Sequence, residues 1–160
     1  MPDTTPLTGA CFCGGVRYRL DRAPMFVHCC HCRDCQKQTG GAFAINALIE
    51  RSCIVLAEGS TEPIRVTMKT DSGRPHDIYR CPVCQSAVWS DYGRRGVMVF
   101  LRVATLDNAQ EIAPDVHIFT RSKLPWVQLP PGARRFEEYY DMQREWPAES
   151  LARRAGAGPR

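Results

Sequence analysis

The chain has 160 residues, a length typical of one domain with a hydrophobic core. Its 24% of charged residues is ordinary for a globular protein, and its mild formal charge of +4 argues neither for nor against nucleic acid. We expect no nucleic-acid partner, because the basic residues are not gathered into one stripe and carry few interleaved aromatic residues. The first ten residues lack the basic start and apolar run of a secretory signal, and every apolar stretch is far shorter than the ~20 residues of a membrane helix. We therefore expect a soluble, cytoplasmic protein without a membrane partner; its oligomeric state is left open.

Short segments with apolar and polar residues in alternation follow one another through most of the chain. Alternation with period two is typical of half-buried strands, because successive side chains point to opposite faces. Helix is expected only for a turn or two after Cys32 and over residues 135–144. The sequence thus predicts a mainly β protein. The segments predicted as strands are 16–20, 43–49, 64–68, 78–80, 87–89, 97–103 and 116–119.

The nine cysteines are the most informative residues of the chain. Eight of them fall into three clusters, at 11–13, 29–35 and 81–84, and Cys53 stands alone as a small residue expected to be buried. An odd number of cysteines in a chain without a secretory signal favours metal thiolates over disulfides.

The first and last clusters together match a structural zinc site. Cys11 and Cys13 share one face of an extended segment, and Cys81 and Cys84 form a Cys-x-x-Cys turn. Neither pair fills a tetrahedral site alone, but the two pairs together supply the four thiolates of a closed structural zinc site. The alternative, in which each pair serves a different metal, remains open at this stage.

The middle cluster predicts a second metal site with three thiolates. Cys30 and Cys32 share a face, and Cys35 follows one helical turn after Cys32. Three protein ligands with an open fourth position are the catalytic arrangement of zinc. His28 has the same parity and could close the site as Cys₃His, which would be structural.

The neighbours of this cluster receive different interpretations. Cys29 and His31 point to the opposite face, so we expect a packed or free thiol and an imidazole that lies outside the ligand shell or at the surface. Arg33 and Lys37 follow closely and can either bind an anionic ligand or be ordinary surface charges.

These clusters resemble the glutathione-dependent formaldehyde-activating enzyme family. The resemblance rests on Cys11-x-Cys13-Gly14-x-Val16-x-Tyr18, then Cys30-His31-Cys32-x-x-Cys35-x-Lys37-x-x-Gly40, then Cys81-x-x-Cys84, with Thr105-Leu106-Asp107, Pro114, His117-Ile118 and Trp126 farther on.

The resemblance implies a single Mss4-like domain of small antiparallel sheets held by zinc, with two zinc sites. It assigns Cys11, Cys13, Cys81 and Cys84 to a structural zinc, and Cys30, Cys32 and Cys35 to a zinc with an exchangeable position. Two departures from the family pattern stand out. Gln85 replaces a glycine after Cys84, where we expect a positive φ and a cost of about 1 kcal/mol. Gly40-Gly41 replaces the family's Gly-Ala.

The activity that the resemblance implies is the condensation of formaldehyde with glutathione to S-hydroxymethylglutathione, which in reverse is a carbon–sulfur lyase reaction. Catalysis would rest on the zinc held by Cys30, Cys32 and Cys35, and Arg33 and Lys37 are candidate contacts for glutathione. Two alternatives are a zinc-stabilised binding module without catalysis and a chain whose metal is only structural.

The span of the resemblance also sets the expected domain boundaries. We expect a flexible amino terminus over residues 1–8, the zinc domain over 9–127, and an extension over 128–146. Residues 147–160, which end in AGAGPR, are expected to be a disordered tail.

Overall fold

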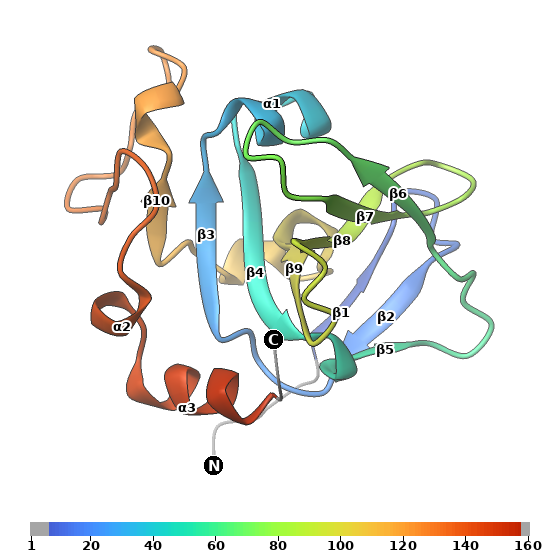
Figure 1. Cartoon of the computed structure of the whole chain (residues 1–160). Coiled ribbons are helices and arrows are strands. Elements are labelled where there is room, and N and C mark those ends of the chain that lie inside the picture. Colours follow the sequence, from blue (N-terminus) through green and yellow to red (C-terminus); the bar gives the residue numbers. More distant parts are fainter. Residues whose placement is uncertain (1–6, 158–160) are drawn as a thin grey trace.

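The computed structural model describes residues 7–157, which form two β-sheets and a helical carboxyl-terminal segment (Figure 1). The expectation for residues 1–6 lies outside this range. The smaller sheet is antiparallel, with the strand order β1-β2-β5. Its strands are β1 (Leu7–Ala10), β2 (Arg17–Leu20) and β5 (Ile54–Leu56).

The larger sheet has seven strands in the order β10-β3-β4-β9-β8-β7-β6. Only the pair β10 and β3 is parallel, and the other neighbours are antiparallel. Strands β6 and β7 run across the direction of β3 and β4, so the sheet is strongly bent (Figure 1). Its strands are β3 (Phe26–Cys30), β4 (Ala44–Glu50), β6 (Ile64–Met68), β7 (His76–Arg80), β8 (Ala87–Tyr92), β9 (Met98–Arg102) and β10 (Val116–Ile118).

The prediction of a mainly β protein is confirmed, with one difference in the sheets. Each segment predicted as a strand contains one, whereas β1, β3 and β5 were not predicted. All five residues of β3 are buried, because this strand is covered on both faces, and such a strand shows no alternation. Instead of small antiparallel sheets alone, the structure has one large sheet with a parallel edge pair.

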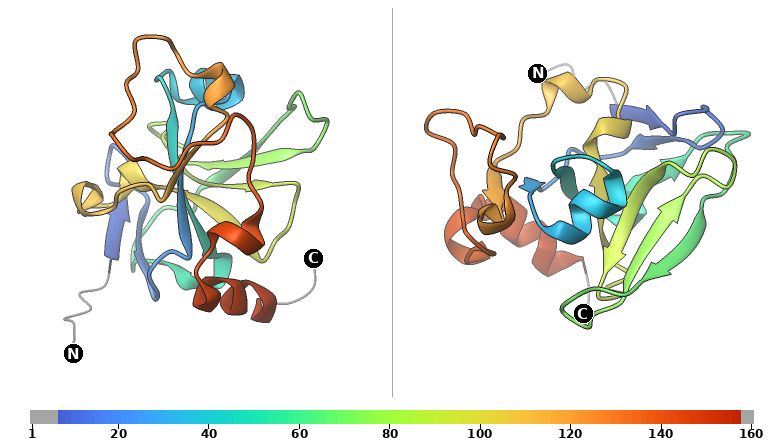
Figure 2. Two further views of the ribbon diagram at one scale, coloured as in Figure 1. Left: turned by 90° about the vertical axis from the view of Figure 1, so that its left-hand side faces the viewer. Right: turned by 90° about the horizontal axis from the view of Figure 1, so that it is seen from above.

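Two apolar clusters cover the two faces at the centre of the larger sheet. One cluster lies toward the smaller sheet and includes Tyr18, Ile49 and Trp89. The other includes Phe26 and packs against aromatic side chains of the carboxyl-terminal segment. Figure 2 shows this segment (orange to red) running along the side of the sheet where β10 and β3 lie.

Helices are few and short. They are α1 (Arg33–Thr39), α2 (Met142–Glu145) and α3 (Ala148–Gly156), and the single turns of 3₁₀ helix are Arg51–Cys53, Val103–Thr105, Ala109–Glu111 and Thr120–Ser122. The helix predicted over 135–144 is therefore wrong except at its end. Over residues 7–157, no helix has the length and apolar character needed to cross a bilayer.

The expectation of a disordered tail is wrong for residues 147–157. Helix α3 docks on the domain through Ser150, whose hydroxyl donates to the Met25 carbonyl at 2.7 Å. Arg153 binds both carboxylate oxygens of Glu50, at 3.0 and 2.6 Å. The sequence conceals this docking because the partners lie about a hundred residues away. Leu7 and Thr8, expected to be flexible, pair with β2.

Candidate metal centres and the adjoining cavity

Four cysteines from the amino-terminal and central segments meet at one point. Their sulfur atoms all lie within 4.8 Å of one another, and the Sγ–Sγ distances are 3.6 Å for Cys11–Cys13 and 3.7 Å for Cys13–Cys81. A disulfide needs about 2.05 Å, whereas two sulfurs of a tetrahedral zinc site lie about 3.8 Å apart. The four residues, which include Cys84, could therefore hold one zinc ion as a tetrathiolate, and their convergence favours this arrangement over separate metals.

The two turns that carry these ligands have the backbone conformation that the site requires. Gly14 has φ 75° after the first pair, and Gln85 has φ 62° after the second. The positive φ expected at Gln85 is thus present. The Gln85 side chain donates to the Pro82 carbonyl at 3.0 Å, and Arg80 donates to the Gln85 carbonyl at 2.8 Å. These two hydrogen bonds offset part of the strain of a non-glycine residue.

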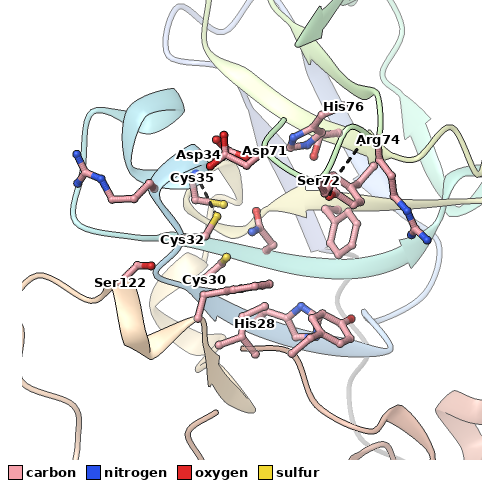
Figure 3. A pocket seen from close by; sticks show the side chains of 18 of the residues that line it. His28, Cys30, Cys32, Asp34, Cys35, Asp71, Ser72, Arg74, His76 and Ser122 are labelled. Carbon is pink, nitrogen blue, oxygen red and sulfur yellow. Dashed lines mark hydrogen bonds between the residues drawn. The ribbon is translucent and has the colours of Figure 1, made fainter. Parts of the chain in front are cut away.

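The second group consists of Cys30 at the end of β3, Cys32 at the amino end of α1 and Cys35 in its first turn. Their sulfur atoms lie within 4.8 Å of one another and point toward a common centre (Figure 3). Cys32 caps the helix, because its sulfur accepts from the Cys35 backbone N–H at 3.3 Å. Hydrogen bonds from the thiols of Cys30 and Cys35 lower the pKa of Cys32 to about 2. The group therefore holds a thiolate at neutral pH, as a metal site requires.

His28 does not join this group, so the closed Cys₃His alternative is not supported. Over residues 7–157, no fourth Cys, His, Asp or Glu lies within ligand distance of all three sulfurs. The His28 Nε2 atom lies instead 2.5 Å from the Tyr140 hydroxyl, which accepts a hydrogen bond from Trp146 Nε1 at 2.7 Å. Burial lowers the pKa of His28 to about 3, so the ring is neutral. Its contact with Tyr140 fits either an Nε2 that accepts the hydroxyl proton, with the ring proton on Nδ1, or an Nε2–H that donates to the hydroxyl oxygen.

A cavity of about 650 Å³ opens beside the three sulfurs of Cys30, Cys32 and Cys35 (Figure 3). His28 lines it, and so does the Arg33 side chain, whereas the exposed Lys37 lies outside the lining. Of the two glutathione contacts expected from the sequence, only Arg33 is thus next to the cavity. The apolar part of the wall consists of Tyr92, Phe100, Ile118, Phe119 and Tyr139.

The charged part of the wall is predominantly basic. Five arginines face two carboxylates, so these side chains alone carry an excess of three positive charges, which the Cys32 thiolate of the same wall reduces. Such a wall favours an anionic ligand. The charged residues are Arg33, Arg74, Arg95, Arg102 and Arg121, against Asp34 and Asp71.

Arg102 is the residue of this wall that sequence reasoning missed. It is only 6% exposed at the end of β9, where its guanidinium donates to Asn46 and, at 3.1 Å, to Gln38. Its Nε has no partner in the described part of the chain. Desolvation lowers the pKa of Arg102, which the nearby Cys35 partly counters. A buried cation beside a thiol cluster compensates thiolate charge. The sequence signal that could have pointed to Arg102 was a charged residue at an inward position of a predicted strand.

The comparisons with known proteins agree with this geometry. Residues 6–122 match the sequence pattern of a family described as "Glutathione-dependent formaldehyde-activating enzyme". The chain belongs to this family. A Halomonas elongata protein that carries the family's name is 28% identical over 126 residues, which are 77% of this chain and 80% of that protein. A crystal structure of a Rhodobacter sphaeroides protein has a TM-score of 0.48 and 19% identity, and covers 67% of this chain and 91% of that chain. This second likeness is too low to bear on the fold.

Membership in the formaldehyde-activating family covers the zinc domain but not the whole cavity. The match ends at residue 122, and Tyr139, Tyr140 and Trp146 follow it. Part of the cavity wall and the hydroxyl that orients His28 therefore come from the carboxyl-terminal segment.

Proposed function

We propose that the protein is a zinc-dependent carbon–sulfur lyase-type enzyme that forms and cleaves S-hydroxymethylglutathione or a similar small glutathione adduct. The observation that carries the proposal is the group of three thiols that, among residues 7–157, has no fourth protein ligand and is placed at the wall of a basic cavity. A binding module without catalysis remains the alternative. The open ligand position beside a cavity favours the enzyme, because a purely structural site is closed.

Two sets of cysteines would hold the metal. Cys11, Cys13, Cys81 and Cys84 fit a structural zinc, and Cys30, Cys32 and Cys35 fit a zinc with an exchangeable position. A zinc ion at the second site would lower the pKa of a bound thiol and polarise a small carbonyl group.

The cavity wall supplies recognition of the tripeptide thiol. Formaldehyde offers almost nothing to recognise, so selectivity depends on contacts with glutathione. Its carboxylates fit the arginines of the wall, of which Arg33 follows Cys32 directly in the chain. Arginine binds carboxylates in a bidentate manner, which fixes the thiol at the three-cysteine end of the cavity.

His28 has the properties of a hydrogen-bond donor to the reacting oxygen. In the proposed tautomer Nε2 accepts from Tyr140, and the Nδ1–H, which has no hydrogen-bond partner within the described residues, can donate to a ligand. When the glutathione sulfur attacks the carbon of formaldehyde, the C=O π bond breaks and negative charge develops on oxygen. A donor on the cavity wall stabilises that charge. In the reverse direction the carbon–sulfur bond breaks and the carbonyl re-forms.

The test uses protein with Co²⁺ in the second site. Glutathione should change the thiolate charge-transfer bands of the cobalt protein, and formaldehyde–glutathione exchange measured by NMR should exceed the spontaneous rate. Both effects should vanish in Cys32→Ser, with Cys53→Ser as the matched control. An unchanged cobalt spectrum with glutathione would rule out this substrate, and a Cys32→Ser protein with full activity would rule out the site.

A further inference from the structure

We infer that Cys29, His31 and His117 form a third metal site, for zinc or a similar borderline divalent cation. It lies on the face of β3 opposite to the three-thiol group. The inference is independent of the proposed function, because it rests on a different set of side chains and on neither glutathione nor formaldehyde.

The arrangement of β3 and β10 brings the three residues together. Cys29 and His31 follow the alternation of the extended chain, so they point away from Cys30 and Cys32. The parallel neighbour β10 places His117 directly opposite Cys29 in register. One extended segment can thus present ligands to two different metals, one on each face.

The distances between the ligand atoms match a tetrahedral metal. His31 Nε2 lies 3.1 Å from His117 Nδ1 and 3.6 Å from Cys29 Sγ, and all three atoms lie within 4.8 Å of one another. In a zinc site, two nitrogens lie about 3.3 Å apart, and a sulfur and a nitrogen about 3.6 Å apart, from the usual bond lengths. One thiolate and two imidazoles are a donor set that zinc and its neighbours prefer.

Hydrogen bonds alone leave this cluster poorly satisfied. His31 Nε2 faces both a sulfur and a nitrogen, but the single proton it can carry satisfies only one of them. His31 is fully buried, so no bulk water can supply the missing hydrogen bond at Nε2. A cation at the common point of the three atoms satisfies all three lone pairs at once, which a proton cannot do.

The surroundings predict an accessible site of moderate affinity. His117 is the most exposed of the three residues, at 9%, so we expect the ion, and water as fourth ligand, to enter past it. The ring of Phe43 covers His31, with centroids 5.4 Å apart. A ligating histidine normally donates its second N–H to an acceptor, and His31 lacks one within the described residues, so we expect weaker binding than at the four-cysteine site.

The experiment counts metal in the full chain. Metal-free protein is titrated with Co²⁺, and binding is followed by the thiolate charge-transfer and d–d absorption bands. A second titration uses ¹¹³Cd²⁺, whose NMR chemical shift reports the number of thiolate ligands at each site. Wild type and the control Cys53→Ser should bind three equivalents, with the weakest at a single-thiolate site. Cys29→Ser and His117→Gln should each bind two and lose the single-thiolate ¹¹³Cd resonance.

The variants also separate this site from its neighbour. Cys35→Ser should lose the three-thiolate ¹¹³Cd resonance and keep the single-thiolate one, even if glutathione turns out not to bind. His117→Gln is the conservative variant should Cys29→Ser fail to fold, because His117 lies at the sheet edge. Two equivalents in wild-type protein, or an unchanged count in folded His117→Gln, would overturn the inference.

Discussion

Removal of the Tyr140 hydroxyl tests how the carboxyl-terminal segment is coupled to the cavity. Tyr140→Phe deletes one oxygen atom that accepts from Trp146 Nε1 and is hydrogen-bonded to His28 Nε2. Tyr140 is 8%, Trp146 5% and His28 1% exposed, so both partners stay buried without a hydrogen bond. Each buried unpaired group costs about 1–3 kcal/mol, and we expect a loss of about 2–4 kcal/mol in the free energy of unfolding.

Urea denaturation of the zinc-loaded protein measures this loss. With a slope of about 2 kcal/mol per M, the midpoint should fall by about 1–2 M. Tyr79→Phe is the matched control, because it removes the same atom from a half-buried tyrosine whose hydroxyl has no hydrogen-bond partner in the described range. Long-range ¹H–¹⁵N NMR should show the proton of His28 on Nδ1 in wild type and a mixture of tautomers in Tyr140→Phe. A loss within about 0.5 kcal/mol of the control, or an Nε2–H tautomer in wild type, would refute the reasoning.

Three further predictions follow from the other contacts. Cys81→Ser should give unfolded protein, because a structural zinc contributes about 10 kcal/mol or more to folding. Cys35→Ser should stay folded, as measured by circular dichroism. Equal unfolding of the two variants would contradict the division into a structural and a reactive site. His28→Ala should keep the zinc content of wild type by elemental analysis, because His28 is no ligand. Burial raises the pKa of Glu50, but hydrogen bonds from Arg153 outweigh it and lower the pKa. The stability that this ion pair contributes is therefore fully present above the pKa of a free glutamate and is lost as the pH falls through the lower pKa of the folded state. Below about pH 4.5, the free energy of unfolding should therefore fall less steeply with pH in Glu50→Gln than in wild type.

Local sequence patterns predicted the features of this protein that depend on a few consecutive residues. Side-chain parity separated Cys30 and Cys32 from Cys29, and the turn after Cys84 has the positive φ expected for Gln85. The period-two pattern found the half-buried strands. It missed β3, because a strand buried on both faces has no polar side to reveal it.

Features that depend on partners far apart in the chain were not predictable. Arg102 reads as one polar residue in an apolar strand, and only the folded sheet places it beside Cys35 and Asn46. Helix α3 reads as a basic tail, because its docking depends on Glu50 and Met25. The cluster of Cys29 and His31 needed a third ligand from β10, whose parallel pairing with β3 no local pattern indicates.

The two parts of the cavity wall have different origins, and this has a consequence for selectivity. The thiol group and all five arginines of the wall lie within residues 6–122, the part that matches the family, whereas Tyr139 and the pair of Tyr140 and Trp146 lie beyond it. The residues that would hold the second metal and the positive charge of the wall therefore lie in the family region. Of the aromatic residues of the wall, Tyr92, Phe100 and Phe119 also lie there, whereas Tyr139 and the hydroxyl that contacts His28 come from the carboxyl-terminal segment. We therefore expect this segment to contribute to the choice of adduct through Tyr139 and through the contact of Tyr140 with His28.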